Sequence, residues 1–313
     1  MEMNRQHRYA TGINHRRSPK KVGRDPGTVM KRQLVKGLKM EGKSLKISLE
    51  AVGMAKSSYY YQPVRKRKPR ALDEALVKSI NEARQGHAEV YGYRKVTMAL
   101  RAAGWTVNGK KVLRHLRALG LTQPRKLKAQ RWSRPAIIRP SVYNTYWEAD
   151  LTYVWTGNAN AYLFVVIDAC NRDIVGDIFS DRCRAREAVE ALEKAVLSRF
   201  GGRVPHGHEL TLRVDRDTQF TARNFREAAK TLNVRLEYAG VRCPEDKPYI
   251  ESFFGSYKTE ELYRNEYNSL AEAITGWGSY RAWYCNDRLH QALWYKSPRD
   301  YAKIARNSKL LVA

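Results

Sequence analysis

Three acidic residues, Asp150, Asp215 and Glu251, are candidates for a metal-dependent phosphoryl-transfer site. Mg²⁺ is a hard cation that prefers oxygen ligands, and a few carboxylates commonly hold it while leaving positions for water and phosphate. Two such ions roughly 3.5–4 Å apart activate the attacking oxygen of an in-line displacement and stabilise the leaving oxygen. We therefore expect the three acids to be catalytic and to bind two Mg²⁺ ions, for which Mn²⁺ can substitute.

The segments around the acids matter because the chain contains 31 Asp and Glu. Residues 147–155 are rich in β-branched and aromatic side chains, which predicts a strand containing the first acid. Residues 210–214 predict a short strand with the second acid at its C-terminal end, where α/β sheets usually bind ligands. Pro248 suits the first turn of a helix containing the third acid, because its missing N–H has no partner there.

The segments between these three complete a mixed α+β (α/β) arrangement. Apolar and β-branched runs predict further strands over residues 161–168, 172–180 and 234–238. Apolar residues at helical spacing predict helices over residues 185–200 and 225–232. The expected order is strand, strand, strand, helix, strand, helix, strand, helix.

Four sequence motifs follow one another along this region. They are WEADLTY at 147–153, VDRDTQF at 214–220, IESFFGSYK at 250–258, and NDRLHQAL at 286–293 followed by Ser297-Pro298. This series resembles, over roughly residues 45 to 302, the integrase-core transposases (OrfB) of bacterial insertion sequences of the IS-three family. The resemblance implies a ribonuclease-H-like core, as in retroviral integrases and DDE transposases, that cleaves DNA at element ends and transfers the strand.

The resemblance also implies partners. Double-stranded DNA would be bound both as inverted-repeat ends and as target, and a homo-oligomer is expected because two ends must meet. In this family an upstream reading frame often supplies a further helix-turn-helix and a leucine zipper by fusion. Lys258 follows Glu251 by two helical turns on nearly the same face and is implied as a DNA-end contact, although a solvated lysine is the alternative.

Two positions depart from the family pattern. Asp217 stands where the family usually has Gly, which adds an acid that can compete as a ligand. Lys247-Pro248 replaces the usual Asn-Ala ahead of the glutamate and is expected to alter how the helix enters the site. Other acids near the predicted strands are expected to be turn or surface residues: Asp168, Asp173, Asp177 and Asp181.

Charge is distributed unevenly along the chain. Residues 1–140 contain 34 Lys and Arg against 8 Asp and Glu, whereas residues 141–313 contain 24 against 23. Nearly the entire formal net charge of +27 therefore precedes the expected core. Phosphate neutralisation and counterion release dominate nucleic-acid affinity, so this imbalance independently predicts a polyanionic partner.

The sequence predicts five regions. Residues 1–40 are a flexible basic arm, 41–64 a helix-turn-helix with Gly53 at its turn, and 65–130 a second helical DNA-binding region that begins with a basic linker at 65–70. The ribonuclease-H-like core covers residues 140–265, and a helical tail covers residues 266–313. The Trp- and Tyr-rich part of the tail is expected to pack on the core or on a neighbouring subunit.

Basic and aromatic residues of the first half are candidate DNA contacts. They are Tyr59, Arg94, Lys95, Lys110, Lys111 and Arg114. Contacts to phosphate position a protein on DNA without specifying sequence. The alternative for the basic residues is a solvated helix face, and for the tyrosines it is core packing.

Several other functions have no support. The chain has no signal peptide and no apolar run of transmembrane length, which predicts a cytoplasmic, nucleoid-associated protein without a membrane partner. Its four cysteines lack zinc-ligand spacing, and no phosphate-cradling loop for ATP is present. The alternatives to a transposase are a ribonuclease-H-like nuclease without joining activity and a transposase-derived DNA-binding regulator.

Overall fold

The computed structural model describes residues 27–61, 71–123, 138, 140–240 and 246–310. The chain divides into two compact units, Met1–Ala71 and Leu72–Ala313. The basic linker expected at residues 65–70, and the arm expected over residues 1–26, lie outside the described residues.

In the first unit, two helices joined by a glycine turn lie where the sequence predicts a helix-turn-helix. Helix α2 (Leu45–Val52) begins at Ser44, whose hydroxyl accepts a hydrogen bond from the Ile47 N–H. It ends at Gly53, which adopts the left-handed conformation with φ of 61° that glycine accommodates most readily. Helix α3 (Lys56–Tyr60) follows. The two short helices and the glycine turn agree with the sequence pattern.

Residues 28–40 are helical, so the prediction of a flexible arm through residue 40 is wrong for this part. They form α1 (Thr28–Met40) because its inward face buries Val35 against Leu49 and Met54. The Arg32 guanidinium also donates two hydrogen bonds, of 2.9 and 2.7 Å, to the Ser58 carbonyl. In the sequence, the many basic residues of this segment obscure the helical spacing of its apolar residues.

The second unit begins with a small helical region. Its elements are α4 (Glu74–Glu82), the 3-10 helix η1 (Gly86–Val90), α5 (Tyr93–Ala102) and α6 (Gly109–Ala118). Their apolar faces meet around Leu76, Val96 and Leu116. Asn108 caps α6, and its side chain accepts a 2.8 Å hydrogen bond from the Lys110 N–H.

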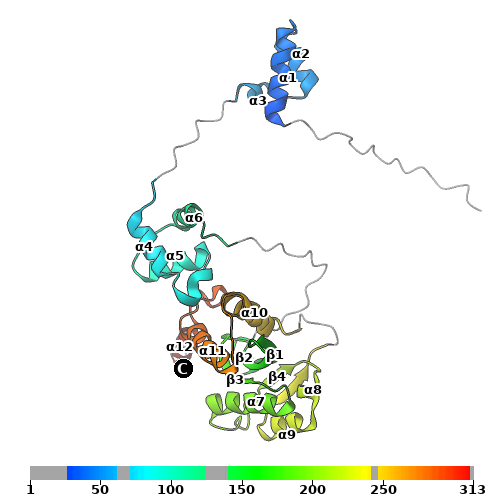
Figure 1. Ribbon diagram of the computed structural model, residues 1–313, viewed down its shortest axis with the longest axis vertical. Helices are drawn as coiled ribbons and strands as arrows, with labels where there is room; N and C mark the ends of the chain where they lie inside the picture. Colours follow the sequence, from blue (N-terminus) through cyan, green and yellow to red (C-terminus); the bar gives the residue numbers. More distant parts are fainter. Residues whose placement is uncertain (1–26, 62–70, 124–137, 139, 241–245, 311–313) are drawn as a thin grey trace, which may run out of the picture. The chain divides into compact units, whose positions relative to one another are not determined.

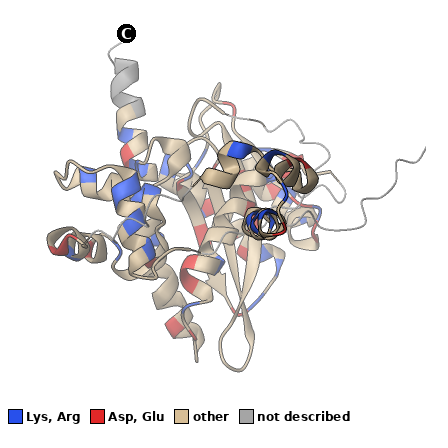
Figure 2. Ribbon diagram, turned by 90° about the horizontal axis from the view of Figure 1, so that it is seen from above, with Lys and Arg blue, Asp and Glu red and all other residues tan. Residues whose placement is uncertain are grey.

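A five-stranded mixed sheet forms the centre of the second unit (Figure 1). Its strands are β1 (Tyr146–Trp155), β2 (Asn160–Asp168), β3 (Ile174–Ser180), β4 (Thr211–Val214) and β5 (Arg235–Tyr238). The order across the sheet is β3-β2-β1-β4-β5. The first three strands pair antiparallel, and β1, β4 and β5 pair parallel. Lys and Arg are absent from β1, β2 and β3 (Figure 2).

Helices cover both faces of the sheet. One face packs against α7 (Ala185–Phe200) and α9 (Arg223–Thr231). The short helix α8 (Thr218–Thr221) adds Phe220 to this core, and the sequence pattern did not predict this helix. Gly176 on β3 allows α7 to approach closely, because a Cβ atom there would lie 2.3 Å from the Ala191 carbonyl oxygen.

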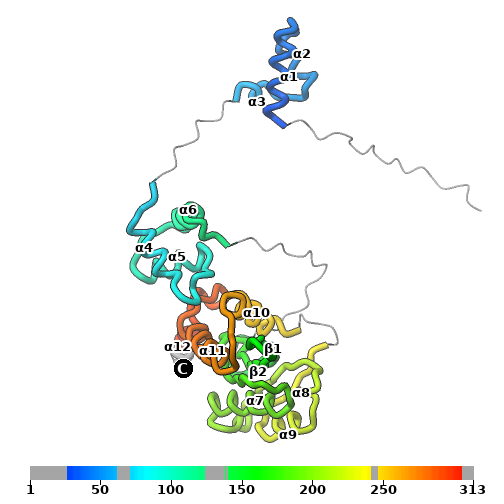
Figure 3. The backbone as a smooth tube through the Cα atoms, in the orientation of Figure 1, coloured from blue at the N-terminus to red at the C-terminus, as the bar shows by residue number. Residues whose placement is uncertain are grey.

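The opposite face is covered by α10 (Pro248–Tyr257) and α11 (Leu270–Asn286). Figure 3 shows α10 on one side of β1 and β2 and α7 on the other. In the chain, the π-helical turn η3 (Lys258–Leu262) connects α10 to the segment before α11. After α11 come the 3-10 helix η4 (Gln291–Leu293) and α12 (Pro298–Leu310).

The aromatic tail packs on the core, as expected. Trp277, Tyr280 and Tyr284 are buried against the Phe253 and Tyr257 side chains of α10. Among the described residues, no helix combines the length and apolarity needed to cross a membrane.

Candidate active site

The pairing of β1 with β4 brings Asp150 and Asp215 to the same level. Glu148 is the register partner of Arg213 in this parallel pair, and each aspartate lies two residues further along. Trp147 and Ala149 pack against the α7 side of the sheet, so the alternate residues of β1 face α10. Two of the three predicted catalytic acids therefore converge on the α10 side.

A lysine ammonium lies between these two carboxylates. Lys247 Nζ is 2.6 Å from Asp215 Oδ2 and 3.3 Å from Asp150 Oδ2. It also donates to the Ala149 carbonyl at 3.4 Å, and the Lys247 side chain is only 3% exposed. The departure from the family pattern at this position thus places a buried cation at the acid pair.

Burial makes a charged Asp150 unfavourable. It raises the pKa of the Asp150 carboxyl, while the Lys247 ammonium and the 2.8 Å hydrogen bond from the Leu151 N–H oppose this shift. Asp215 is more open to solvent, with 39% of its side chain exposed. A cation at this position therefore stabilises the pair mainly through Asp150.

The third acid, Glu251, lies in the first turn of α10 and is exposed. Within the described part of the chain, no group of three or more His, Cys, Asp or Glu side chains is close enough to hold a metal ion. The structure therefore brings together two of the three predicted ligands and leaves Glu251 outside the pair. Its metal role stays a prediction.

Glu148 is a site residue that the sequence analysis missed. Its Oε2 accepts hydrogen bonds from the Tyr249 N–H at 2.9 Å and the Ile250 N–H at 2.8 Å, at the start of α10. The residue is 1% exposed, and burial raises the pKa of its carboxyl to about 7, although the two backbone hydrogen bonds oppose this. Glu148 therefore ties the helix that contains Glu251 to the strand that contains Asp150. Alternation with Asp150 along the predicted strand was the available signal.

Nearby acids have structural roles. The Asp168 carboxylate, at the end of β2, accepts hydrogen bonds from the Asn144 and Cys170 N–H groups, and Asp173, in the turn that follows, pairs with Arg199 of α7. Both acids are buried. Asp217, the proposed competing ligand, is exposed at the start of α8.

Asp177 ties β3 to α11 through two contacts. Its carboxylate accepts a 2.7 Å hydrogen bond from the Trp277 indole and forms a 2.9 Å ion pair with Arg281. Like the buried turn acids, it is accounted for by packing of the core.

The candidate DNA contacts fall into different environments. Arg94 and Lys110 are exposed, whereas Lys258 at the end of α10 and Arg114 on α6 are half-buried. Lys111 forms a 2.8 Å ion pair with Asp73. DNA contact by these side chains stays a prediction.

Two further candidates, Tyr59 and Lys95, are half-buried. Tyr59 packs against the cluster formed by Val35, Leu49 and Met54, in agreement with the alternative of core packing. Lys95 is half-buried and lines a cavity together with Arg288.

The donor set at the acid pair fits a divalent cation. Two carboxylates already surround one cationic group, and carboxylate oxygens are the ligands that Mg²⁺ prefers. Asp150 and Asp215 are thus suited to hold the ion once the Lys247 ammonium leaves, and Glu251 follows Lys247 by one helical turn.

Comparisons with known families match most of the second unit. An HTH-like domain matches residues 71–129, and two integrase core domain models match residues 141–244 and 232–298. Together with the mixed sheet and its helical layers, these matches confirm the expected ribonuclease-H-like core and the helical region before it.

Individual relatives are insertion-sequence proteins. The transposase for insertion sequence element IS904 of Lactococcus lactis is 27% identical over 243 residues, which cover 74% of this chain and 94% of that protein. Transposase InsF for insertion sequence IS3A of Escherichia coli is 30% identical over 195 residues, which cover 57% of this chain and 65% of that protein.

One solved structure is similar to this chain at 18% identity and a TM-score of 0.45. It is the simian T-cell lymphotropic virus intasome in complex with PP2A regulatory subunit B56 gamma, and the match covers 71% of this chain and 73% of that one.

The integrase core matches run from residue 141 to residue 298, and the relatives named above are transposases. The chain therefore belongs to the integrase-core transposases of insertion sequences, in the IS-three family.

Proposed function

We propose that this protein is a DDE transposase that cleaves one DNA strand at each end of its element and joins the freed strand to a target. The observation that supports this most is the convergence of Asp150 and Asp215 on a single cation position beside α10. Glu251, one helical turn after Lys247, would complete the ligand set.

The chain's own residues have separate tasks in this proposal. Asp150, Asp215 and Glu251 would hold two Mg²⁺ ions, or Mn²⁺ in their place, which supply activation of the attacking oxygen and stabilisation of the leaving one. Until then the Lys247 ammonium offsets one negative charge of the acid pair. Glu148 positions α10 through its two backbone hydrogen bonds.

The proposal has two steps, a hydrolysis and a transesterification. In the first, a water oxygen bonds to phosphorus and the bond to the 3′-oxygen breaks, which leaves a 3′-hydroxyl and a 5′-phosphate. In the second, the 3′-hydroxyl attacks a target phosphodiester, and the target's own 3′-oxygen leaves. One phosphodiester forms as another breaks, so the joining step needs no nucleotide cofactor.

The remaining parts would handle DNA and assembly. Residues 41–64 and 65–130 would bind the inverted-repeat ends, residues 140–265 would form the catalytic core, and residues 266–313 would support it. A homo-oligomer would hold two ends together, with an upstream-frame product as a fusion or partner. The site of action would be the DNA of a bacterial cytoplasm, at the nucleoid.

A strand-transfer assay with labelled element ends tests this proposal. The ends would be the terminal inverted repeats that the proposal expects in the DNA flanking the gene, and the reaction contains Mg²⁺ or Mn²⁺. The proposal predicts cleaved ends and joined product. Cleavage without joining would instead indicate a nuclease, and end binding without cleavage would indicate a transposase-derived regulator.

A further inference from the structure

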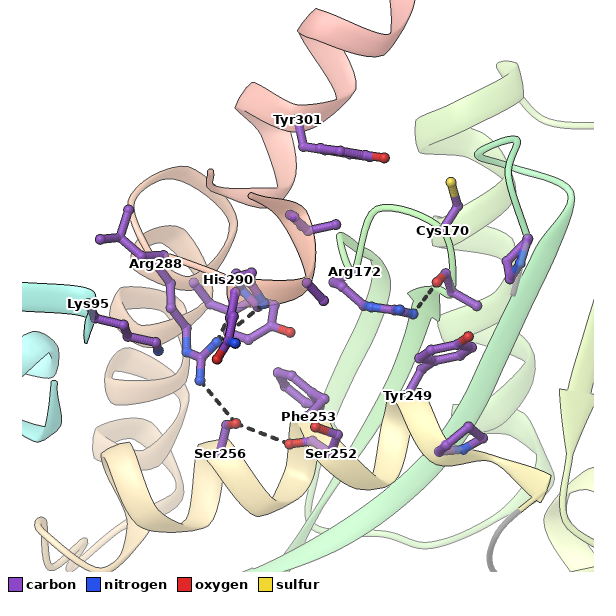
Figure 4. A pocket seen from close by; sticks show the side chains of 18 residues that line it. Lys95, Cys170, Arg172, Tyr249, Ser252, Phe253, Ser256, Arg288, His290 and Tyr301 are labelled. Carbon is purple, nitrogen blue, oxygen red and sulfur yellow. Dashed lines mark hydrogen bonds between the residues drawn. The ribbon is translucent and has the colours of Figure 1, made fainter. Parts of the chain in front are cut away.

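A basic cavity of about 710 Å³ lies beside α10, apart from the acid pair. Its walls come from α10, the β2–β3 turn and the segment around η4, with Lys95 of α5 and Tyr301 of α12 at its edges. Figure 4 shows Lys95 and Arg288 on one side of this space and Arg172 and Tyr249 on the other. The volume falls in the range of sites that bind small molecules.

The charge of the lining favours an anion. Lys95, Arg172 and Arg288 line the cavity, and the lining residues include no Asp or Glu. Glu260, outside the lining, neutralises Arg288 through contacts of 2.6 and 2.7 Å. No carboxylate within the described residues forms an ion pair with Lys95 or Arg172, so the charges of these two lining side chains are not directly paired in this part of the chain.

Burial makes this excess of positive charge costly. The pKa of Lys95 is lowered to about 7, first by burial and then by the nearby Arg288 guanidinium, whereas Glu260 acts in the opposite direction. His290, beside Arg288, also has a pKa held well below its usual range by burial and these cations. An anion that enters the cavity would relieve this repulsion.

The rest of the lining suits a nucleoside. The Arg172 guanidinium lies 3.5 Å over the Tyr249 ring, and Phe253 and Tyr301 add aromatic surface. Aromatic side chains and arginine planes stack on bases without regard to sequence. The Ser252 hydroxyl of α10 also lines the space and can donate a hydrogen bond.

We propose that this cavity, which we call the α10 cavity, binds one unstacked nucleotide of a DNA strand. The basic side chains would hold its phosphate, and the aromatic side chains would hold its base. Glu251 lies within one helical turn of Tyr249 and Ser252 on α10, so the cavity and this acid share the same helix. This inference rests on the proposed function, because it takes DNA as the source of the nucleotide.

Binding of a short single-stranded oligonucleotide to the full chain tests the inference. Lys95→Met and Arg172→Met remove these two cations without leaving a buried carboxylate unpaired. Each is expected to weaken binding about tenfold, which corresponds to loss of one charge-assisted contact. Lys194→Met, on the exposed face of α7, is the matched control and should bind as the wild type does. Unchanged binding by both cavity variants would overturn the inference.

Photocrosslinking identifies the position of the bound base. An oligonucleotide that contains 5-iododeoxyuridine should crosslink to Tyr249 or Tyr301, and Lys95→Met should reduce that crosslink. Inorganic phosphate at the same concentration should not displace the oligonucleotide. Displacement by phosphate as effective as by the oligonucleotide itself would indicate a free-anion site, and crosslinks only outside the cavity would also contradict the proposal.

The two proposals fail separately in these experiments. If the wild type neither cleaves nor joins DNA but still shows the Lys95-dependent crosslink, the transposase chemistry is wrong and the cavity assignment stands. If the wild type joins DNA while the cavity variants retain full binding and crosslinking, the cavity assignment is wrong and the transposase chemistry stands.

Discussion

The Lys247 ammonium lies closer to Asp215, at 2.6 Å, than to Asp150, at 3.3 Å, and contacts both carboxylates. This side chain takes the position at which a divalent cation is expected to act. The resting chain therefore contains its own counterion at the candidate active site.

Replacing this counterion should change how the protein responds to Mg²⁺. Lys247→Asn should lower the metal-free unfolding free energy by about 1–3 kcal/mol, because Asp150 loses its cationic partner while the more exposed Asp215 is screened by solvent. Thermal unfolding at increasing Mg²⁺ should show a larger stabilisation of the variant than of the wild type. Lys194→Asn, on the surface of α7, is the control. Equal Mg²⁺ dependence of both proteins would rule out competition between Lys247 and the metal.

Glu148 should matter for stability and catalysis but not for DNA-end binding. Glu148→Ala leaves the Tyr249 and Ile250 N–H groups without their acceptor, which should cost about 1–3 kcal/mol. Glu148→Gln keeps one carbonyl acceptor and should lose less. Chemical denaturation and strand-transfer rates check both effects, with Glu193→Ala on exposed α7 as the control. An unfolding free energy equal to that of the wild type would show that Glu148 does not hold α10.

Acid should destabilise the fold through His290. Burial and the Arg288, Lys95 and Arg172 cations hold its folded-state pKa well below the usual 6.5, so the unfolded chain binds the extra proton. Stability attributable to this histidine is therefore present above pH 6.5 and declines as the pH falls below it. His290→Gln should flatten this decline in the melting temperature, whereas exposed His206→Gln should not. A slope that His290→Gln leaves unchanged would contradict the assignment.

Two glycines should respond oppositely to alanine. At Gly176 a Cβ atom would meet the Ala191 carbonyl oxygen at 2.3 Å, so Gly176→Ala should destabilise the fold by about 1–3 kcal/mol. At Gly278, inside α11, nothing lies within 4 Å, and Gly278→Ala should stabilise the fold by about 0.5–1 kcal/mol. Unfolding midpoints measure both changes, and a neutral Gly176→Ala would contradict the close packing of α7 on β3.

The regular core could be predicted because its local signals are strong. Residues 147–155 and 161–168 combine β-branched, aromatic and apolar side chains, and the structure has strands in both places. The strand that ends before Asp215 was predictable for the same reason, because β4 also contains β-branched and apolar residues. By contrast, α1 was missed because basic residues surround the single buried Val35.

The interior of the site could not be predicted in the same way. The contact between Lys247 and the two aspartates joins residues far apart in the chain, so it depends on how α10 docks on the sheet. The sequence marked Lys247 only as a departure from the family pattern. From the sequence, Lys95 was likewise expected to be an exposed basic residue. In the structure it lines a cavity together with Arg288 of the C-terminal tail.

Strand transfer by Asp215→Asn is the most direct test of the candidate active site. This variant keeps the shape of the side chain but loses the charge that faces Lys247. Labelled element ends, Mg²⁺ or Mn²⁺ and a target DNA are the components, and end binding is measured in parallel. The account predicts that Asp215→Asn binds the ends as tightly as the wild type and yields neither cleaved nor joined product. Strand transfer at the wild-type rate by this variant would contradict the assignment of Asp215 to the catalytic metal site.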